Sequence, residues 1–121
     1  MQENRGKEQP DVAAEISYLS PDRGRKSGIQ SGAWSHLHYQ NETWHVWQHF
    51  KDTAWVWPGE THTVYLSFQY PLLQVGRLDV GTTFVLVEGA RVVAYGKVTQ
   101  LLHLAENTEQ QRTSPFQEVQ E

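Results

Sequence analysis

The chain has 121 residues with a formal net charge of -4, and 38% of them are hydrophobic, which suits one small domain. It contains no cysteine, which excludes disulfides, thiolate metal sites and a cysteine nucleophile. No apolar run approaches the length of a membrane-spanning helix, and the first eleven residues lack the apolar stretch of a signal peptide, so we expect a cytoplasmic protein without a membrane partner.

The acidic excess lies at the two ends of the chain. Residues 1–12 hold two basic and three acidic side chains, residues 106–121 hold one basic and four acidic, and residues 13–105 hold seven of each. Both ends are poor in large apolar groups, so they bury too little surface to offset the entropy of ordering. We expect disordered tails at 1–12 and 106–121 around one domain at 13–105. Its neutral charge is unlike that of a general polyanion-binding protein.

The sequence predicts that the domain is built of short strands. In chain order, the expected strands are residues 14–19, 34–39, 43–50, 54–57, 61–70, 83–87 and 91–102. The clearest is 61–70, where Val64, Leu66 and Phe68 alternate with polar side chains, which is the period of two of a half-buried strand. No window of useful length has the period of an amphipathic helix. We therefore expect an all-β fold, either a small closed barrel or a sandwich.

No motif of an enzyme is present in the sequence. The chain lacks a Gly-x4-Gly-Lys-Ser/Thr phosphate loop and a Gly-x-Ser-x-Gly nucleophile elbow. Carboxylates are sparse in the domain, and no close pair suggests acid–base catalysis. We therefore expect no enzymatic activity and no cofactor.

A basic cluster, Arg23, Arg25 and Lys26, lies in a loop rich in glycine and serine between two expected strands. Guanidinium and ammonium groups beside free backbone N–H groups suit a phosphate. Loops carry binding residues more often than strands do. The alternative is a loop whose charges are simply solvated.

All five tryptophans lie between residues 34 and 57. On regular strands Trp55 and Trp57 share a face, whereas Trp44 and Trp47 do not, so the five rings cannot all be core or all surface. One interpretation is that they fill the core and plug the barrel ends. The other is an exposed aromatic platform for stacked bases or for a protein partner. For the protein partner we expect Trp34 and Trp47 in the contact.

The histidines fall in pairs on two successive expected strands. His36 and His38 share a face of one strand, and His45 and His49 share a face of the next. Such pairs on neighbouring strands can converge on a metal ion. No cysteine or carboxylate completes the set, so the alternative is ordinary polar positions on an outer face, and we assign no metal ligand.

Several short motifs occur in the order and spacing of a known family. Gly24-Arg25-Lys26-Ser27-Gly28 falls on the family's Gly-Arg-His-Thr-Pro, and Trp57-Pro58-Gly59-Glu60 falls on its Met-Pro-Gly-Asp turn. Residues 81–99, which read GTTFVLVEGARVVAYGKVT, align without a gap with the family's Gly-Leu-Arg-Phe-Ala-Ile-Arg-Glu-Gly-Gly-Arg-Thr-Val-Gly-Ala-Gly-Val-Val-Thr. Over residues 14–102 the chain therefore resembles the C-terminal, third domain of elongation factor Tu, here as a stand-alone protein.

The resemblance implies a closed antiparallel β-barrel of about six strands. In the family this domain contacts aminoacyl-tRNA, the GTPase domain and the exchange factor. By position, Arg25 matches a family arginine in the tRNA-facing loop, and Arg91 matches an arginine of the last hairpin. Lys26 and Ser27 replace the family's histidine and threonine, and they can still donate to phosphate or ribose oxygens. The GTPase domain has no counterpart here, so no GTP is expected on this chain.

Three functions follow for a non-catalytic module related to translation. In the first, the partner is tRNA or another RNA, bound through the loop at residues 23–28. In the second, the partner is a translation-associated protein that contacts a tryptophan-rich surface, without RNA binding, because a stand-alone copy must use or cover the face that sister domains would hide. The third is metal binding by histidines. The RNA-binding residues expected in the first case are Arg23, Arg25, Lys26, Ser27 and Arg91.

Overall fold

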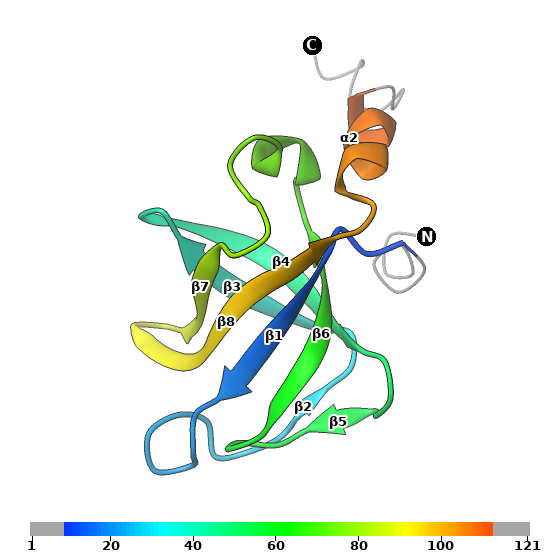
Figure 1. Cartoon of the computed structure of the whole chain (residues 1–121). Coiled ribbons are helices and arrows are strands. Elements are labelled where there is room, and N and C mark those ends of the chain that lie inside the picture. Colours follow the sequence, from blue (N-terminus) through cyan, green and yellow to red (C-terminus); the bar gives the residue numbers. More distant parts are fainter. Residues whose placement is uncertain (1–8, 113–121) are drawn as a thin grey trace.

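Six strands close into an antiparallel barrel, as expected (Figure 1). Around the barrel the strand order is β1-β6-β4-β3-β7-β8. The structure is a computed structural model that describes residues 9–112, so the outer parts of both expected tails, 1–8 and 113–121, lie outside the described residues. The barrel strands are β1 (Val12–Tyr18), β3 (Ala33–Tyr39), β4 (Glu42–Phe50), β6 (Thr61–Phe68), β7 (Thr83–Glu88) and β8 (Arg91–Leu101).

The core forms where apolar side chains alternate along these strands. In β6, Val64, Leu66 and Phe68 are each at most 1% exposed, so the predicted alternation places them inside the barrel. Phe84 of β7 is buried opposite Gly96 of β8, and a Cβ at position 96 would overlap its ring. Glycine at this position therefore makes room for the phenyl ring between two paired strands.

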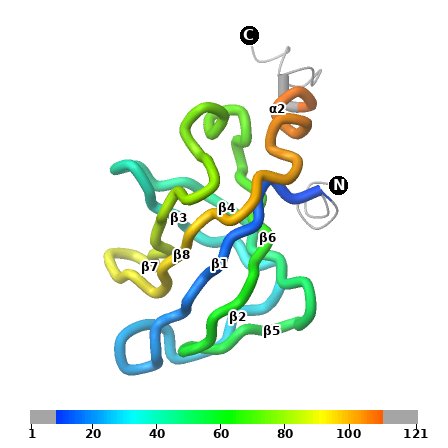
Figure 2. Tube along the Cα trace, in the orientation of Figure 1, coloured from blue at the N-terminus to red at the C-terminus, as the bar shows by residue number. Residues whose placement is uncertain are grey.

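The two ends of the barrel carry different elements. At one end β2 (Ile29–Gln30) and β5 (Trp55–Val56) form a separate two-stranded sheet, next to the loop of residues 19–28. Figure 2 shows this sheet and loop at one end of the barrel, and the 3-10 helix η1 (Pro71–Gln74) and the helix α2 (Leu104–Arg112) at the other. No helix within residues 9–112 is long and apolar enough to cross a lipid bilayer.

Helix α2 is an element that the sequence did not predict. Asn107 is 2% exposed, and its side-chain nitrogen donates to Oδ1 of Asp11 at 2.5 Å and to the carbonyl oxygen of Gln9 at 2.9 Å. Oδ2 of Asp11 accepts from the backbone nitrogen of Phe68 at 2.7 Å, so the buried carboxylate joins the helix to the barrel. The expected tails therefore begin farther out, because residues 9–12 and 106–112 are part of the fold.

Candidate functional site

The loop of residues 19–28 folds back on the β7–β8 hairpin, and Arg25 holds it there. Its Nη1 forms an ion pair with Glu88 at the end of β7. Its Nε donates to the carbonyl oxygen of Ser27 at 3.2 Å, and its Nη2 donates to Oγ of Ser27 at 3.1 Å and to the carbonyl oxygen of Gly28 at 3.2 Å. Four of the five N–H donors of this guanidinium therefore bind the protein itself.

Two more of the expected RNA-binding residues also hold this loop. Nη1 of Arg91 donates to the carbonyl oxygen of Gly24 at 3.1 Å, which ties the hairpin to the loop. Nζ of Lys26 donates to the carbonyl oxygen of Pro21 at 3.0 Å, although the lysine itself is exposed. The structure thus brings the predicted cations together, but it uses Arg91 and Arg25 to fix the loop. Arg23 is exposed on the same loop.

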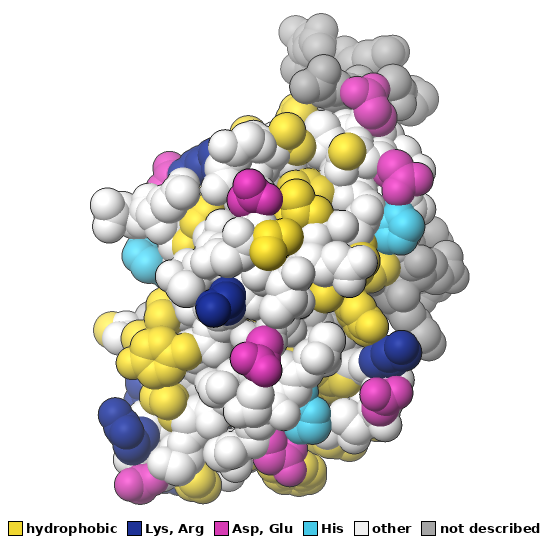
Figure 3. All heavy atoms as spheres, viewed as in Figure 1, with side chains coloured by type: hydrophobic (Ala, Val, Ile, Leu, Met, Phe, Trp, Pro, Cys, Tyr) yellow, Lys and Arg dark blue, Asp and Glu magenta, His cyan; other side chains and the backbone are white. Residues whose placement is uncertain are grey.

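The charge around the loop is mixed. A hydrogen bond from the Ser20 hydroxyl lowers the pKa of Asp22 below its usual range, so this carboxylate stays ionised beside the cations. Glu88 adds a second negative charge. On the face drawn in Figure 3, Lys and Arg side chains are interspersed with Asp and Glu and form no continuous basic area. Arg23, Arg25, Lys26 and Arg91 face only Asp22 and Glu88, so the basic excess here is small, whereas a strong attraction for polyanions needs a large one.

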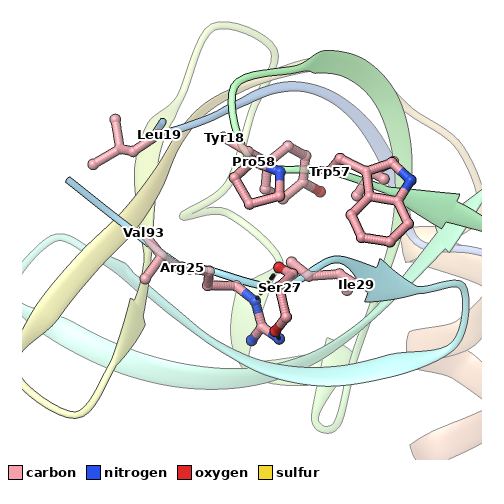
Figure 4. A pocket seen from close by; sticks show the side chains of 9 residues that line it. Tyr18, Leu19, Arg25, Ser27, Ile29, Trp57, Pro58 and Val93 are labelled. Atoms are coloured by element: carbon pink, nitrogen blue, oxygen red, sulfur yellow. Dashed lines mark hydrogen bonds between the residues drawn. The ribbon is translucent and has the colours of Figure 1, made fainter. Parts of the chain in front are cut away.

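A hollow beneath the loop is filled by side chains. Figure 4 shows Arg25 and Ser27 on one side of it and Trp57, Pro58 and Tyr18 on the other. No volume for a water molecule is left between them. The hollow is therefore a packed contact between the loop and the turn after β5.

A second, open cavity of about 180 Å³ lies between the start of β3 and the β7–β8 hairpin. Its lining includes Arg25, Glu88 and Ser35, with Gln48 buried at its inner side. The Tyr18 hydroxyl donates to Oε1 of Gln48 at 2.5 Å, and Nε2 of Gln48 donates to Oγ of Ser35 at 2.6 Å. Burial raises the pKa of Tyr18, so its phenol stays protonated and keeps this chain of donors intact. The cavity is polar and has room for a side chain of a partner.

Three of the five tryptophans are strongly exposed: Trp34 is 45% exposed, Trp55 43% and Trp57 52%. Trp55 and Trp57 stack with ring centroids 5.8 Å apart, and Trp34 meets the half-buried Trp47 edge to face at 4.4 Å. Both arrangements are favourable for aromatic pairs. The fifth, Trp44, is half-buried under the guanidinium of Arg77, which lies 5.2 Å from its ring.

The exposed rings gather around residues 28–30. Trp57 packs so closely on Gly28 that a Cβ there would overlap its ring, and Trp55 pairs with Gln30 in the small sheet. Trp34 lines the open cavity together with residues 28 and 30. We call Trp34, Trp47, Trp55 and Trp57 the tryptophan surface. It consists of one stacked pair and one edge-to-face pair, which lie on the two sides of residues 28–30.

The structure does not assemble four histidines around one point. It pairs His36 with His45 across strands β3 and β4, with ring centroids 4.7 Å apart. His38 shares a hydrogen bond of 3.0 Å between its Nδ1 and Oγ1 of Thr43, and His49 is buried. Among the described residues, no group of three or more histidine, cysteine or acidic side chains can hold a metal ion.

Sequence reasoning missed Glu88, Gln48 and Ser35 as parts of this region. Glu88 lies 63 residues from its partner Arg25, and no local pattern signals such a contact. The shared parity of Trp55 and Trp57 correctly predicted their common face, and of the two interpretations that the sequence left open, core or surface, the structure shows an exposed face for these two rings. Comparison of the sequence with models of protein families found no match, and neither did comparison with curated proteins.

Proposed function

We propose that the protein is a non-catalytic binding module that recognises a protein partner through its tryptophan surface. The observation that carries this proposal is the clustering of three rings, each more than 40% exposed, around residues 28–30. Indole rings are enriched in protein interfaces, where they supply a large share of the binding energy. Large apolar side chains gathered in one region of a surface are typical of protein interaction sites, because a partner that covers them removes their apolar area from water.

The rings are also held in place before any partner arrives. Trp55 and Trp57 stack on each other, and Trp47 supports Trp34. A side chain that is already fixed loses less conformational entropy on binding than a free one. The cavity beside Trp34 adds polar contacts at the rim of the same surface, because Ser35 and Glu88 line it.

As to ancestry, we propose a relative of the third domain of elongation factor Tu. What supports this is the closed barrel of six strands, together with the glycine turn at Gly89, whose φ is +63°. In that family the barrel packs against other protein domains, so a barrel of this kind offers a face to another protein. The tryptophan surface is the apolar part of the barrel that fits this role.

The test is affinity capture with the full chain and two variants. The double variant Trp34→Ser/Trp57→Ser removes the two most exposed rings of the surface, and Tyr95→Ser removes a ring that is 53% exposed on β8. We expect one protein to be captured by the unchanged chain and by Tyr95→Ser, and to be lost with the double variant. Equal capture by all three would contradict the proposal, as would recovery of RNA in place of protein.

RNA binding is the second candidate, favoured by the exposed Arg23 and Lys26 on a loop next to rings that can stack on bases. The test is fluorescence anisotropy of labelled tRNA and of unstructured RNA at about 50 mM salt. Arg23→Ala/Lys26→Ala should weaken binding, and added salt should weaken it steeply. The same affinity for this variant, or no binding at low salt, removes this candidate. Arg25 is unsuited to the test because it holds the loop.

A further inference from the structure

Two imidazoles meet on the outer face of strands β3 and β4. His36 and His45 are directly paired across the strands, with ring centroids 4.7 Å apart and ring planes tilted by 58°. His36 is exposed and His45 is half-buried, so the pair is accessible from solvent. Side chains paired across antiparallel strands are held about 4.5–5.5 Å apart at Cβ, which lets two imidazoles turn toward one point.

Among the described side chains, none forms a hydrogen bond with the ring nitrogens of this pair. Nδ1 of His38, Nε2 of His62 and Nδ1 of His103 each lie 2.7 to 3.0 Å from an oxygen of another side chain. Within residues 9–110, no such hydrogen bond reaches His36 or His45. Within the described part of the chain, the ring nitrogens of His36 and His45 are therefore open to a ligand from solvent.

The surroundings also restrict how the pair can move. The Trp34 ring stacks on His45 with centroids 5.3 Å apart and planes 24° apart. Both histidines lie on strands that are paired on each side in the closed barrel. A ligand therefore meets two rings whose backbone spacing is already fixed, which lowers the entropic cost of holding an ion between them.

We propose that His36 and His45 together bind one divalent transition-metal ion. Neutral imidazole prefers Cu²⁺, Ni²⁺ and Zn²⁺ over Mg²⁺ and Ca²⁺, and the order of affinity for such ligands places Cu²⁺ first. The protein supplies two ligands, and water fills the other positions of the ion. The formal net charge of -4 favours the approach of a cation. This inference does not rest on the proposed protein partner.

The primary test is a titration of the full chain with Cu²⁺, in which binding is monitored by tryptophan fluorescence. Because Trp34 stacks on one of the two ligands, bound Cu²⁺ should quench part of the emission, with saturation at one ion per chain. Ni²⁺ and Zn²⁺ should compete with Cu²⁺, and Mg²⁺ should not. Absence of saturable binding at this stoichiometry would overturn the proposal.

Matched variants locate the ion. His36→Ala and His45→Ala should each lower the affinity for Cu²⁺ by about tenfold or more, on the scale seen when metal sites lose a supporting group. His38→Ala removes a histidine two positions away on the same strand face, and it should leave the affinity unchanged. An equal loss in His38→Ala, or no loss in either of the other two, refutes the pair as the site.

Nuclear magnetic resonance of the unchanged chain keeps the test independent of whether a variant folds. Addition of Zn²⁺, which is diamagnetic, should shift the imidazole signals of His36 and His45. The signals of His62 and His103, which are bound to carboxylates, should stay in place. Shifts that appear only at histidines outside the pair would assign the metal to another place and reject the inference.

Discussion

Replacing Arg25 with alanine removes the side chain that holds the loop of residues 19–28 to the hairpin. The change deletes three hydrogen bonds to oxygens of Ser27 and Gly28, and it deletes the ion pair with Glu88. Two of the lost acceptors are backbone carbonyl oxygens of the loop itself. We therefore expect the loop to become mobile while the barrel strands stay paired.

The size of the effect follows from these contacts. Each hydrogen bond contributes about 0.5–1.5 kcal/mol net, and an ion pair between partly exposed groups contributes about 0–1 kcal/mol. The side chain of Arg25 is 28% exposed, so water recovers part of this loss. We expect Arg25→Ala to lower the free energy of unfolding by about 2–3 kcal/mol. For a domain of this size, that corresponds to a fall of about 10–20 °C in the unfolding midpoint.

The assay is thermal unfolding monitored by circular dichroism. Arg23→Ala is the matched control, because Arg23 is an exposed arginine of the same loop and its removal should change stability by less than about 0.5 kcal/mol. Glu88→Ala should cost only the ion pair, and adding it to Arg25→Ala should change little further. If Arg25→Ala were as mild as Arg23→Ala, the hydrogen bonds would not persist in solution, and Arg25 would instead be free for a ligand.

Three further changes test other parts of the fold. Gly96→Ala places a methyl group against the buried Phe84 ring and should destabilise the barrel by about 1–3 kcal/mol, measured by urea unfolding; a neutral effect would contradict the tight packing. Asn107→Ala removes the hydrogen bonds that its amide donates to Oδ1 of the buried Asp11 carboxylate and to the carbonyl oxygen of Gln9, and it should cost about 1.5–3 kcal/mol, with faster amide exchange in α2 and not in β6. The hydrogen bond with the imidazole of His62 lowers the pKa of Glu60 in the folded protein below its ordinary value of 4.5. The ionised Glu60 therefore stabilises the fold above about pH 4.5, and this contribution is lost as the pH falls through the pKa of Glu60 in the folded protein. We therefore expect the unfolding midpoint to fall on acidification from about pH 5 to pH 3, and a midpoint that rises over this range would contradict the prediction.

The barrel could be predicted because its strands follow a local rule. Val64, Leu66 and Phe68 alternate with polar residues, and this alternation alone states which side faces the core. Helix α2 could not be predicted in this way. Its buried side chains include the polar Asn107 and Thr108, so the helix has no apolar stripe that a periodicity could reveal.

The candidate site depended on contacts that the sequence does not encode locally. The sequence marked Arg25 as a cation in a loop, but its partner Glu88 lies at the end of another strand. Likewise, His36 and His45 meet because β3 and β4 pair in one particular register, and a shift of one residue would turn one of them to the other face. Residue type could be read from the sequence, whereas the partner of each residue could not.

The hydrogen bonds from Asn107 to Gln9 and Asp11 fasten the first and last described segments to each other at the α2 end of the barrel. The small sheet that carries Trp55 lies at the opposite end (Figure 1). The described part of the chain therefore begins and ends on the side of the barrel opposite the small sheet. A partner that approaches the small sheet therefore meets Trp55 from the side away from residues 9 and 112.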